Sequence, residues 1–283
     1  MTWRAHLQLK YTLQDGRCVG HSTHVGPLRV LKSLYPEGPA ICHHVLVHPP
    51  GGVVGGDELH VDAHIGTGAH AVLTTPGATR FYRSEGAPAL QKVALHAAAG
   101  ARVEWLPLET IAHPGCIAEN RLQLHLQPGS EAIAWDTLVL GLPASGEAFA
   151  SADSASRFQQ HMEVPGQWLE RGLLRADDTT LLQSPLGLAG QPVMATLGFF
   201  SGSPLPAARR DALLEAARQV IADCPLPAVS ARAGATAPQP GVVLLRLLAP
   251  KVEPAMALLR AVRAAWRQQA WGLAAEPPRI WRT

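Results

Sequence analysis

The chain has 283 residues, of which 47% are hydrophobic and only 16% are charged, and its formal net charge is +2. This composition excludes an intrinsically disordered chain, and the small net charge gives no electrostatic case for binding nucleic acid or an anionic membrane. The small share of charged residues indicates that a partner covers part of the apolar surface.

Strands are predicted over most of the first 200 residues. Apolar and polar side chains alternate with a period of two over 3–13, 58–65 and 121–127, as in strands that bury one face. Asp15-Gly16 follows the first of these and indicates a hairpin turn. Turn-forming residues separate further predicted strands at 28–34, 41–48, 69–75, 90–96, 102–108, 131–140, 157–164 and 192–200.

The last third of the chain changes character. After Pro206, apolar residues recur at helical spacing over 207–223, and the same pattern returns over 253–271, so two amphipathic helices are expected. The Pro- and Ala-rich stretch 225–240 is predicted to be a loop, and the apolar run 241–248 to be a buried strand.

These elements together predict a mainly β fold of stacked antiparallel sheets with a small C-terminal helical annex of two helices. We expect a single domain over 1–283, with a β body over 1–200 and a helix-strand-helix annex over 206–271.

The cysteines and the N-terminus bear on the compartment. No two cysteines have metal-ribbon or redox spacing, and a chain of this length does not need disulfides, which favours a reducing environment. The N-terminus lacks the apolar core of a signal peptide, and no run approaches ~18 uninterrupted apolar residues. A cytoplasmic protein without a membrane span is expected. The four cysteines are Cys18, Cys42, Cys116 and Cys224.

Twelve of the 13 histidines lie within residues 1–125, and one group of them surrounds a cysteine. In the run Cys42-His43-His44, followed by His48, thiolate and imidazole are ligands that suit nickel or zinc. On a strand, Cys42, His44 and His48 share one face and His43 points to the other.

A second pattern, His60-x-Asp62-x-His64, places three possible ligands on the polar face of one strand. Same-face neighbours on a strand are about 6.6 Å apart, so two of them can share an ion but three on one strand would be stretched. A solvated strand face, or histidines satisfied by hydrogen bonds, is the competing interpretation of both patterns.

The glycine-rich loop 49–57 reads Pro-Pro-Gly-Gly-Val-Val-Gly-Gly-Asp. It lacks the Gly-Lys-Ser/Thr of a phosphate loop, and an alternating strand follows it instead of a helix. The four glycines indicate backbone at positive φ or close contact with another chain, and therefore a structural turn or a partner-contact loop. In the nearby run Arg80-Phe81-Tyr82-Arg83, the arginines and rings fit either an interface or a turn followed by an edge strand.

An ordered set of short strings resembles the urease accessory protein UreD family, also called UreH, over nearly the whole chain. The strings are Gly26-Pro27-Leu28, Leu34-Tyr35-Pro36-Glu37-Gly38, Cys42-His43, His48-Pro49-Pro50-Gly51-Gly52, Gly55-Gly56-Asp57, Thr74-Thr75-Pro76-Gly77-Ala78, Phe81-Tyr82-Arg83, Glu104-Trp105-Leu106-Pro107, Ala144-Ser145-Gly146-Glu147 and Pro278-Arg279-Ile280-Trp281.

The resemblance implies a cytosolic, non-enzymatic scaffold for nickel insertion into apo-urease. It implies binding to UreF, through UreF to the GTPase UreG, and docking on the urease apoprotein, with UreE as nickel donor. It also implies a mostly β fold of stacked sheets with two helices. No tightly bound cofactor is expected, only weak and transient nickel, with Cys42, His43, His48 and Asp57 around the glycine-rich loop as the predicted contributors.

Two other functions remain open from the residues alone. The first is a metal-dependent hydrolase, which would hold a tight metal and a bound water. The second is a purely structural interaction module without a metal role. The hydrolase would use either Cys42, His44 and His48 or His60, Asp62 and His64.

Overall fold

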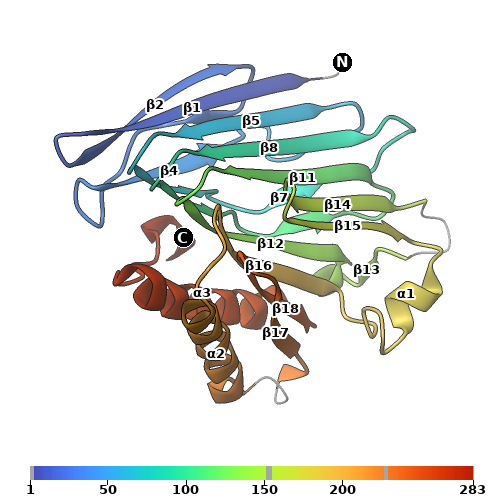
Figure 1. Cartoon of the computed structure of the whole chain (residues 1–283). Coiled ribbons are helices and arrows are strands. Elements are labelled where there is room, and N and C mark those ends of the chain that lie inside the picture. The colour runs from blue at the N-terminus through green and yellow to red at the C-terminus, as the bar shows by residue number, and fades with distance from the viewer. Residues whose placement is uncertain (1–2, 151–154, 226–228, 283) are drawn as a thin grey trace.

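The computed structural model describes residues 3–150, 155–225 and 229–282. Two β-sheets pack face to face, and helices α2 (Ala207–Asp223) and α3 (Val252–Trp271) cover the outer face of the larger sheet (Figure 1). The mainly β prediction is confirmed, and the two predicted C-terminal helices are present.

The smaller sheet has seven strands in the order β15-β14-β11-β8-β5-β1-β2. Its five central strands pair in parallel, and an antiparallel hairpin partner closes each edge. The strands are β1 (Arg4–Gln14), β2 (Arg17–Val25), β5 (Glu58–Ile65), β8 (Ala89–Ala97), β11 (Ile117–Leu126), β14 (Arg157–Val164) and β15 (Trp168–Arg175).

The larger sheet follows the order β17-β18-β16-β12-β9-β6-β4-β3. Strands β4, β6, β9 and β12 pair in parallel, whereas the strands outside them pair antiparallel. The strands are β3 (Arg29–Val30), β4 (Ile41–Val47), β6 (His70–Thr74), β9 (Arg102–Leu106), β12 (Glu131–Leu142), β16 (Val193–Ser201), β17 (Arg232–Gln239) and β18 (Val242–Ala249), with the short β7 (Thr79–Phe81), β10 (Thr110–Ala112) and β13 (Glu147–Ala148) beside this path.

The prediction of purely antiparallel sheets is wrong. From β4 to β12 the chain passes repeatedly from one sheet to the other, so consecutive strands stack in solenoid-like fashion and neighbours within each sheet run parallel. The period-two pattern reports which face of a strand is buried, and it does not report the direction of the neighbouring strand.

One further local prediction is wrong, and one short helix was not predicted. The loop predicted at 225–240 contains β17, an edge strand paired with β18, while 226–228 lie outside the described residues. Pro238 is accommodated because the pairing skips from Thr236 to Gln239 at a bulge, where a missing N–H removes no ladder bond. The sequence also gave no sign of α1 (Thr179–Gln183), a helix of little more than one turn.

Two hydrophobic cores hold these layers together. One lies between the sheets and includes the inward alternate residues of β1, β5, β8 and β11. The other lies between the larger sheet and the helices, where Trp266 packs edge-on to Phe199 and donates a 2.8 Å hydrogen bond to the Leu213 carbonyl. Among the described residues, no helix combines the length and apolar character that crossing a membrane requires.

Candidate functional site

Cys42 and His44 point from β4 into the space between the sheets, as their shared strand face predicts. The Sγ atom of Cys42 lies 3.9 Å from Nε2 of His44. The two ring nitrogens of His44 also lie 2.7 Å from the Tyr11 hydroxyl and 2.8 Å from the Ser33 hydroxyl. This histidine is therefore satisfied by hydrogen bonds within the core.

His43 points to the opposite face of β4, toward α3. Its Nε2 atom lies 2.8 Å from Oε1 of Glu37, and Arg267 of α3 holds the same carboxylate with bonds of 3.1 and 2.5 Å. Burial by itself raises the pKa of Glu37, but the hydrogen bonds from His43 and Arg267 outweigh it and lower that pKa. His43 is thus part of a buried ion-pair network between sheet and helix.

His48 and Asp57 do lie near each other at the glycine-rich loop. Burial lowers the pKa of His48, and the nearby Asp57 carboxylate opposes that shift. Asp57 is also a structural residue, because it accepts backbone N–H bonds from Trp3 at 2.9 Å and Val54 at 3.1 Å. The structure does not gather the four predicted nickel contacts in one place, since Cys42 and His43 point away from each other across β4.

Two glycines of the loop have the positive φ that the sequence indicates, and the other two pack against side chains of their own chain. Gly51 and Gly56 have φ values of +77° and +90°. At Gly52 and Gly55 a Cβ would lie 2.0 Å from the Tyr82 ring and 2.2 Å from the Ser84 hydroxyl. Strand β5 follows directly, so the loop is a structural turn that packs tightly against its own chain.

A buried polar row that the sequence analysis missed lies between the sheets. Oδ2 of Asp136 on β12 accepts from Asn120 at 3.0 Å, and Asn120 accepts from Gln91 at 3.0 Å. Burial raises the pKa of Asp136, and hydrogen bonds from Gln160 and Asn120 oppose the shift. One feature of the sequence could have indicated this row. Asn120 is a polar residue at an inward position of an alternating strand, between the inward residues Ala118 and Leu122.

Only one group of described residues brings three possible metal ligands within 4.8 Å of one another, and it comprises Asp62, His64 and His96. The pattern His60-x-Asp62-x-His64 thus contributes two of its members. Its third member, His60, lies 3.3 Å from a Glu58 carboxylate oxygen instead. The sequence pattern could not indicate His96, which comes from the neighbouring strand β8.

Comparison with known proteins assigns nearly the whole chain to one protein family. The sequence model of the UreD urease accessory protein family matches residues 4–282. The chain belongs to this family. Curated proteins named "Urease accessory protein UreD" are 58% identical in Verminephrobacter eiseniae and 57% identical in Polaromonas sp. and Paracidovorax citrulli, each over 281 residues and 99% of both chains.

Membership of the UreD family confirms the resemblance drawn from the short strings and does not favour the hydrolase. In the two ligand sets that the sequence offers for a hydrolase, both ring nitrogens of His44 are engaged by hydrogen bonds and His60 contacts Glu58. A hydrolase would instead need ligands that converge on a metal-bound water.

Proposed function

We propose that this chain is a non-catalytic scaffold for the insertion of nickel into apo-urease. The observation that carries the proposal is the match of residues 4–282 to the UreD urease accessory protein family. In this proposal the chain works in the cytoplasm, binds UreF and through it the GTPase UreG, and docks on the urease apoprotein. UreE supplies the nickel.

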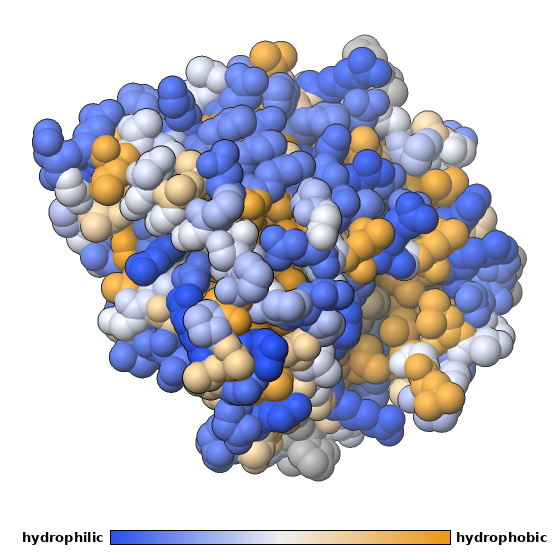
Figure 2. Space-filling model, in the orientation of Figure 1, coloured by the Kyte–Doolittle hydropathy of each residue, from blue (hydrophilic) through white to orange (hydrophobic). Residues whose placement is uncertain are grey.

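The surface supports a protein that works within a complex. Apolar residues gather around α1 and the nearby edge of the smaller sheet (Figure 2). On the edge strand β15, Leu169 is 55% exposed and Leu173 is 43% exposed, and Leu186, just after α1, is 98% exposed. Exposed leucines beside an unpaired strand edge favour coverage by another protein.

Nickel is the cargo in this proposal and is held only weakly. Because a closed, tight site would retain the ion, transit needs ligands that exchange. His48 and Asp57 at the glycine-rich loop are candidates for brief contacts with nickel. Cys42 and His43 could contact nickel only if the ion replaced their present hydrogen-bond partners, His44 and Glu37. No tightly bound cofactor is part of the mechanism.

The decisive experiment is to produce urease with its accessory proteins in the presence and absence of this chain, under limiting nickel. We expect urease made without the chain to contain little nickel and to hydrolyse urea slowly, while the amount of apoprotein stays the same. Pull-down of the chain should recover UreF and UreG together, and UreG should be lost when UreF is omitted. Full nickel loading of urease without the chain would contradict the proposal.

A further inference from the structure

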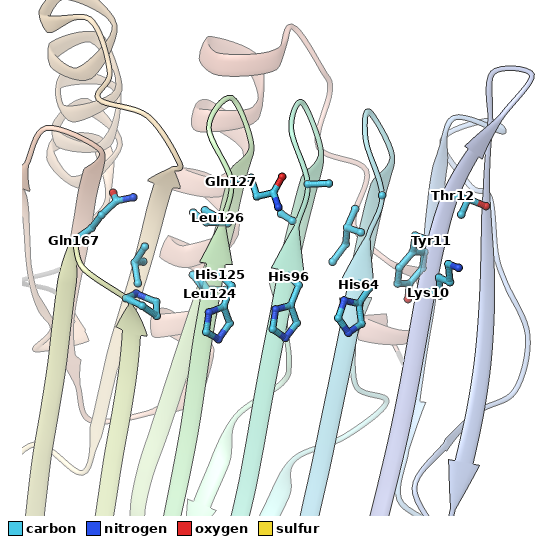
Figure 3. A pocket seen from close by; sticks show the side chains of 16 residues that line it. Lys10, Tyr11, Thr12, His64, His96, Leu124, His125, Leu126, Gln127 and Gln167 are labelled. Atoms are coloured by element: carbon cyan, nitrogen blue, oxygen red, sulfur yellow. The ribbon is translucent and has the colours of Figure 1, made fainter.

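Three histidines form a stack across the outer face of the smaller sheet. His64 on β5, His96 on β8 and His125 on β11 occupy register positions directly beside one another. Each neighbouring pair of rings has centroids 4.5 Å apart, with interplanar angles of 7° and 6° (Figure 3). Parallel pairing of the three strands produces this arrangement, because it aligns one outward residue from each.

A carboxylate lies against one end of the stack. Oδ1 of Asp62, two residues before His64 on β5, is 2.8 Å from Nε2 of His64 and 3.7 Å from Nε2 of His96. This oxygen is buried, and neither contact has the geometry of a hydrogen bond. Oδ1 of Asp62 is thus a buried acceptor without a hydrogen-bond partner, and two imidazole nitrogens lie beside it. These three atoms form a set of metal ligands without an ion to satisfy them.

The distances suit a metal ion after small side-chain rotations. The three ligand atoms lie within 4.8 Å of one another, and ligands at about 2.1 Å from a metal are about 3 Å apart when adjacent. His64 and Asp62 are partly exposed, so their side chains can rotate toward a shared ion. Because the side chains of His64 and Asp62 are 62% and 36% exposed, water can reach the remaining coordination positions.

Two charged side chains besides Asp62 flank the stack. Lys10 on β1 is in register with His64 and adds a positive charge, while Glu163 on β14 lies at the far side beyond His125. Burial lowers the pKa of His96, His125 lowers it further, and Asp62 opposes the shift.

We propose that Asp62, His64 and His96 form an open, exchangeable binding site for a borderline divalent metal ion such as Ni²⁺ or Zn²⁺. Imidazole and carboxylate ligands suit these ions, and three protein ligands leave positions for water. The site lies on the outer face of the sheet, away from the glycine-rich loop. The site follows from the geometry of this sheet alone and does not depend on the proposed function.

The test measures equilibrium binding of Ni²⁺, Zn²⁺ and Mg²⁺ to the full chain, alone or as a soluble complex with its partner. We expect Ni²⁺ and Zn²⁺ to bind and Mg²⁺ not to bind. Loss of a ligand in His64→Ala or His96→Ala should weaken Ni²⁺ binding about tenfold or more. The matched control is His21→Ala, an exposed histidine of the same sheet in register with Lys10, which should bind Ni²⁺ like the wild type.

Two size-preserving variants separate the loss of a ligand from a loss of folding. His96→Gln and Asp62→Asn remove a ligand but nearly preserve the size of the side chain. They should therefore weaken Ni²⁺ binding without changing the thermal midpoint of unfolding. The proposal is overturned if the wild type binds neither ion, if the triad variants bind as the wild type does, or if His21→Ala loses as much affinity as they do.

Discussion

Nε of Arg263 donates a 2.7 Å hydrogen bond to Glu104, which precedes it by 159 residues, and both side chains are almost completely buried. The bond joins α3 to β9 across the second hydrophobic core. Nε2 of His70 lies 3.0 Å from the same carboxylate, and Arg267 lies 3.4 Å from it. Glu104 therefore supplies the negative charge around which the helix is fixed to the sheet.

Glu104→Gln should destabilise the protein severely. The variant keeps the size of the side chain and its hydrogen bonding to His70, but it leaves Arg263 without its carboxylate partner, whereas Arg267 retains Glu37. Removal of one partner from a buried ion pair costs about 3–5 kcal/mol. Urea unfolding at pH 7 measures the loss, and Asp177→Asn, which removes an exposed partner of Arg175, is the control and should change little.

The same carboxylate should make stability depend on pH. Burial raises the pKa of Glu104, but the charge of Arg263 and the His70 bond outweigh it and hold that pKa far below its usual value. Its contribution is present above the unfolded-state pKa of about 4.3 and is lost as the pH falls toward the folded-state pKa. Burial also lowers the pKa of His70, so stability should already decline below about pH 6.5. Urea unfolding from pH 7 to pH 3 should show both declines, and the second should be smaller in the Glu104→Gln variant, where Glu37 still contributes to it.

The thiols provide a prediction about reactivity. Cys18, Cys42 and Cys116 are buried, and only Cys224 is partly accessible. Burial raises the pKa of Cys116 to about 12, which further suppresses its thiolate. A thiol reagent should therefore label one cysteine quickly in the native protein and all four in denaturant. Rapid labelling of Cys18 or Cys42 under native conditions would contradict the packing between the sheets.

The sequence predicted the positions of most strands because one face of each is buried, and that face determines the alternating pattern. It could not predict which strands are neighbours, since pairing depends on contacts between distant segments. This limit explains why the sequence analysis predicted neither the parallel pairing nor His96 as the third residue of the proposed metal site. Asp62 and His64 were identifiable along one strand, whereas His96 joins them only through the β5–β8 register.

The metal contacts predicted at β4 stay a prediction, and they show a second limit of the sequence. The sequence showed that Cys42 and His43 face opposite sides of a strand, but it did not show what each side contacts. The structure supplies Glu37 for His43 and Tyr11 with Ser33 for His44. Composition reveals which residues can bind a metal, whereas only the fold shows which of them are already hydrogen-bonded.

The glycine-rich loop should tolerate no side chain at its packed or left-handed positions. Gly56→Ala forces an L-residue to φ near +90° and should cost about 1–3 kcal/mol. Gly52→Ala brings a Cβ within 2.0 Å of the Tyr82 ring and should also destabilise the protein. Gly77→Ala is the control, because no atom lies within 4 Å of its added Cβ. Equal thermal midpoints for all three variants would contradict this account.

The role of the loop in nickel transit is best tested at His48. The structure shows that Asp57→Ala also removes an acceptor from two backbone N–H groups, so this variant should lose about 1–3 kcal/mol of stability. His48→Ala should leave folding and complex assembly unchanged while it lowers urease activation under limiting nickel. Urease nickel content and pull-down of the partners are measured in the same samples. Wild-type activation by an assembled His48→Ala complex would remove the loop from the nickel route.

The exposed leucines of β15 lead to a prediction about partner binding. A ligand that binds only the folded state stabilises it by about 2.7 kcal/mol at a hundredfold excess over Kd, so the thermal midpoint should rise when UreF is added. If a partner covers the β15 edge, Leu169→Ser combined with Leu173→Ser should reduce that rise and make the isolated chain more soluble. Leu31→Ser is the matched control, because this leucine is 77% exposed but follows β3, at the other end of the sheets from β15. If UreF raises the thermal midpoint of the double variant as much as that of the wild type, UreF binds another surface. If UreF does not raise the thermal midpoint of the wild type, the proposed binding of UreF is contradicted.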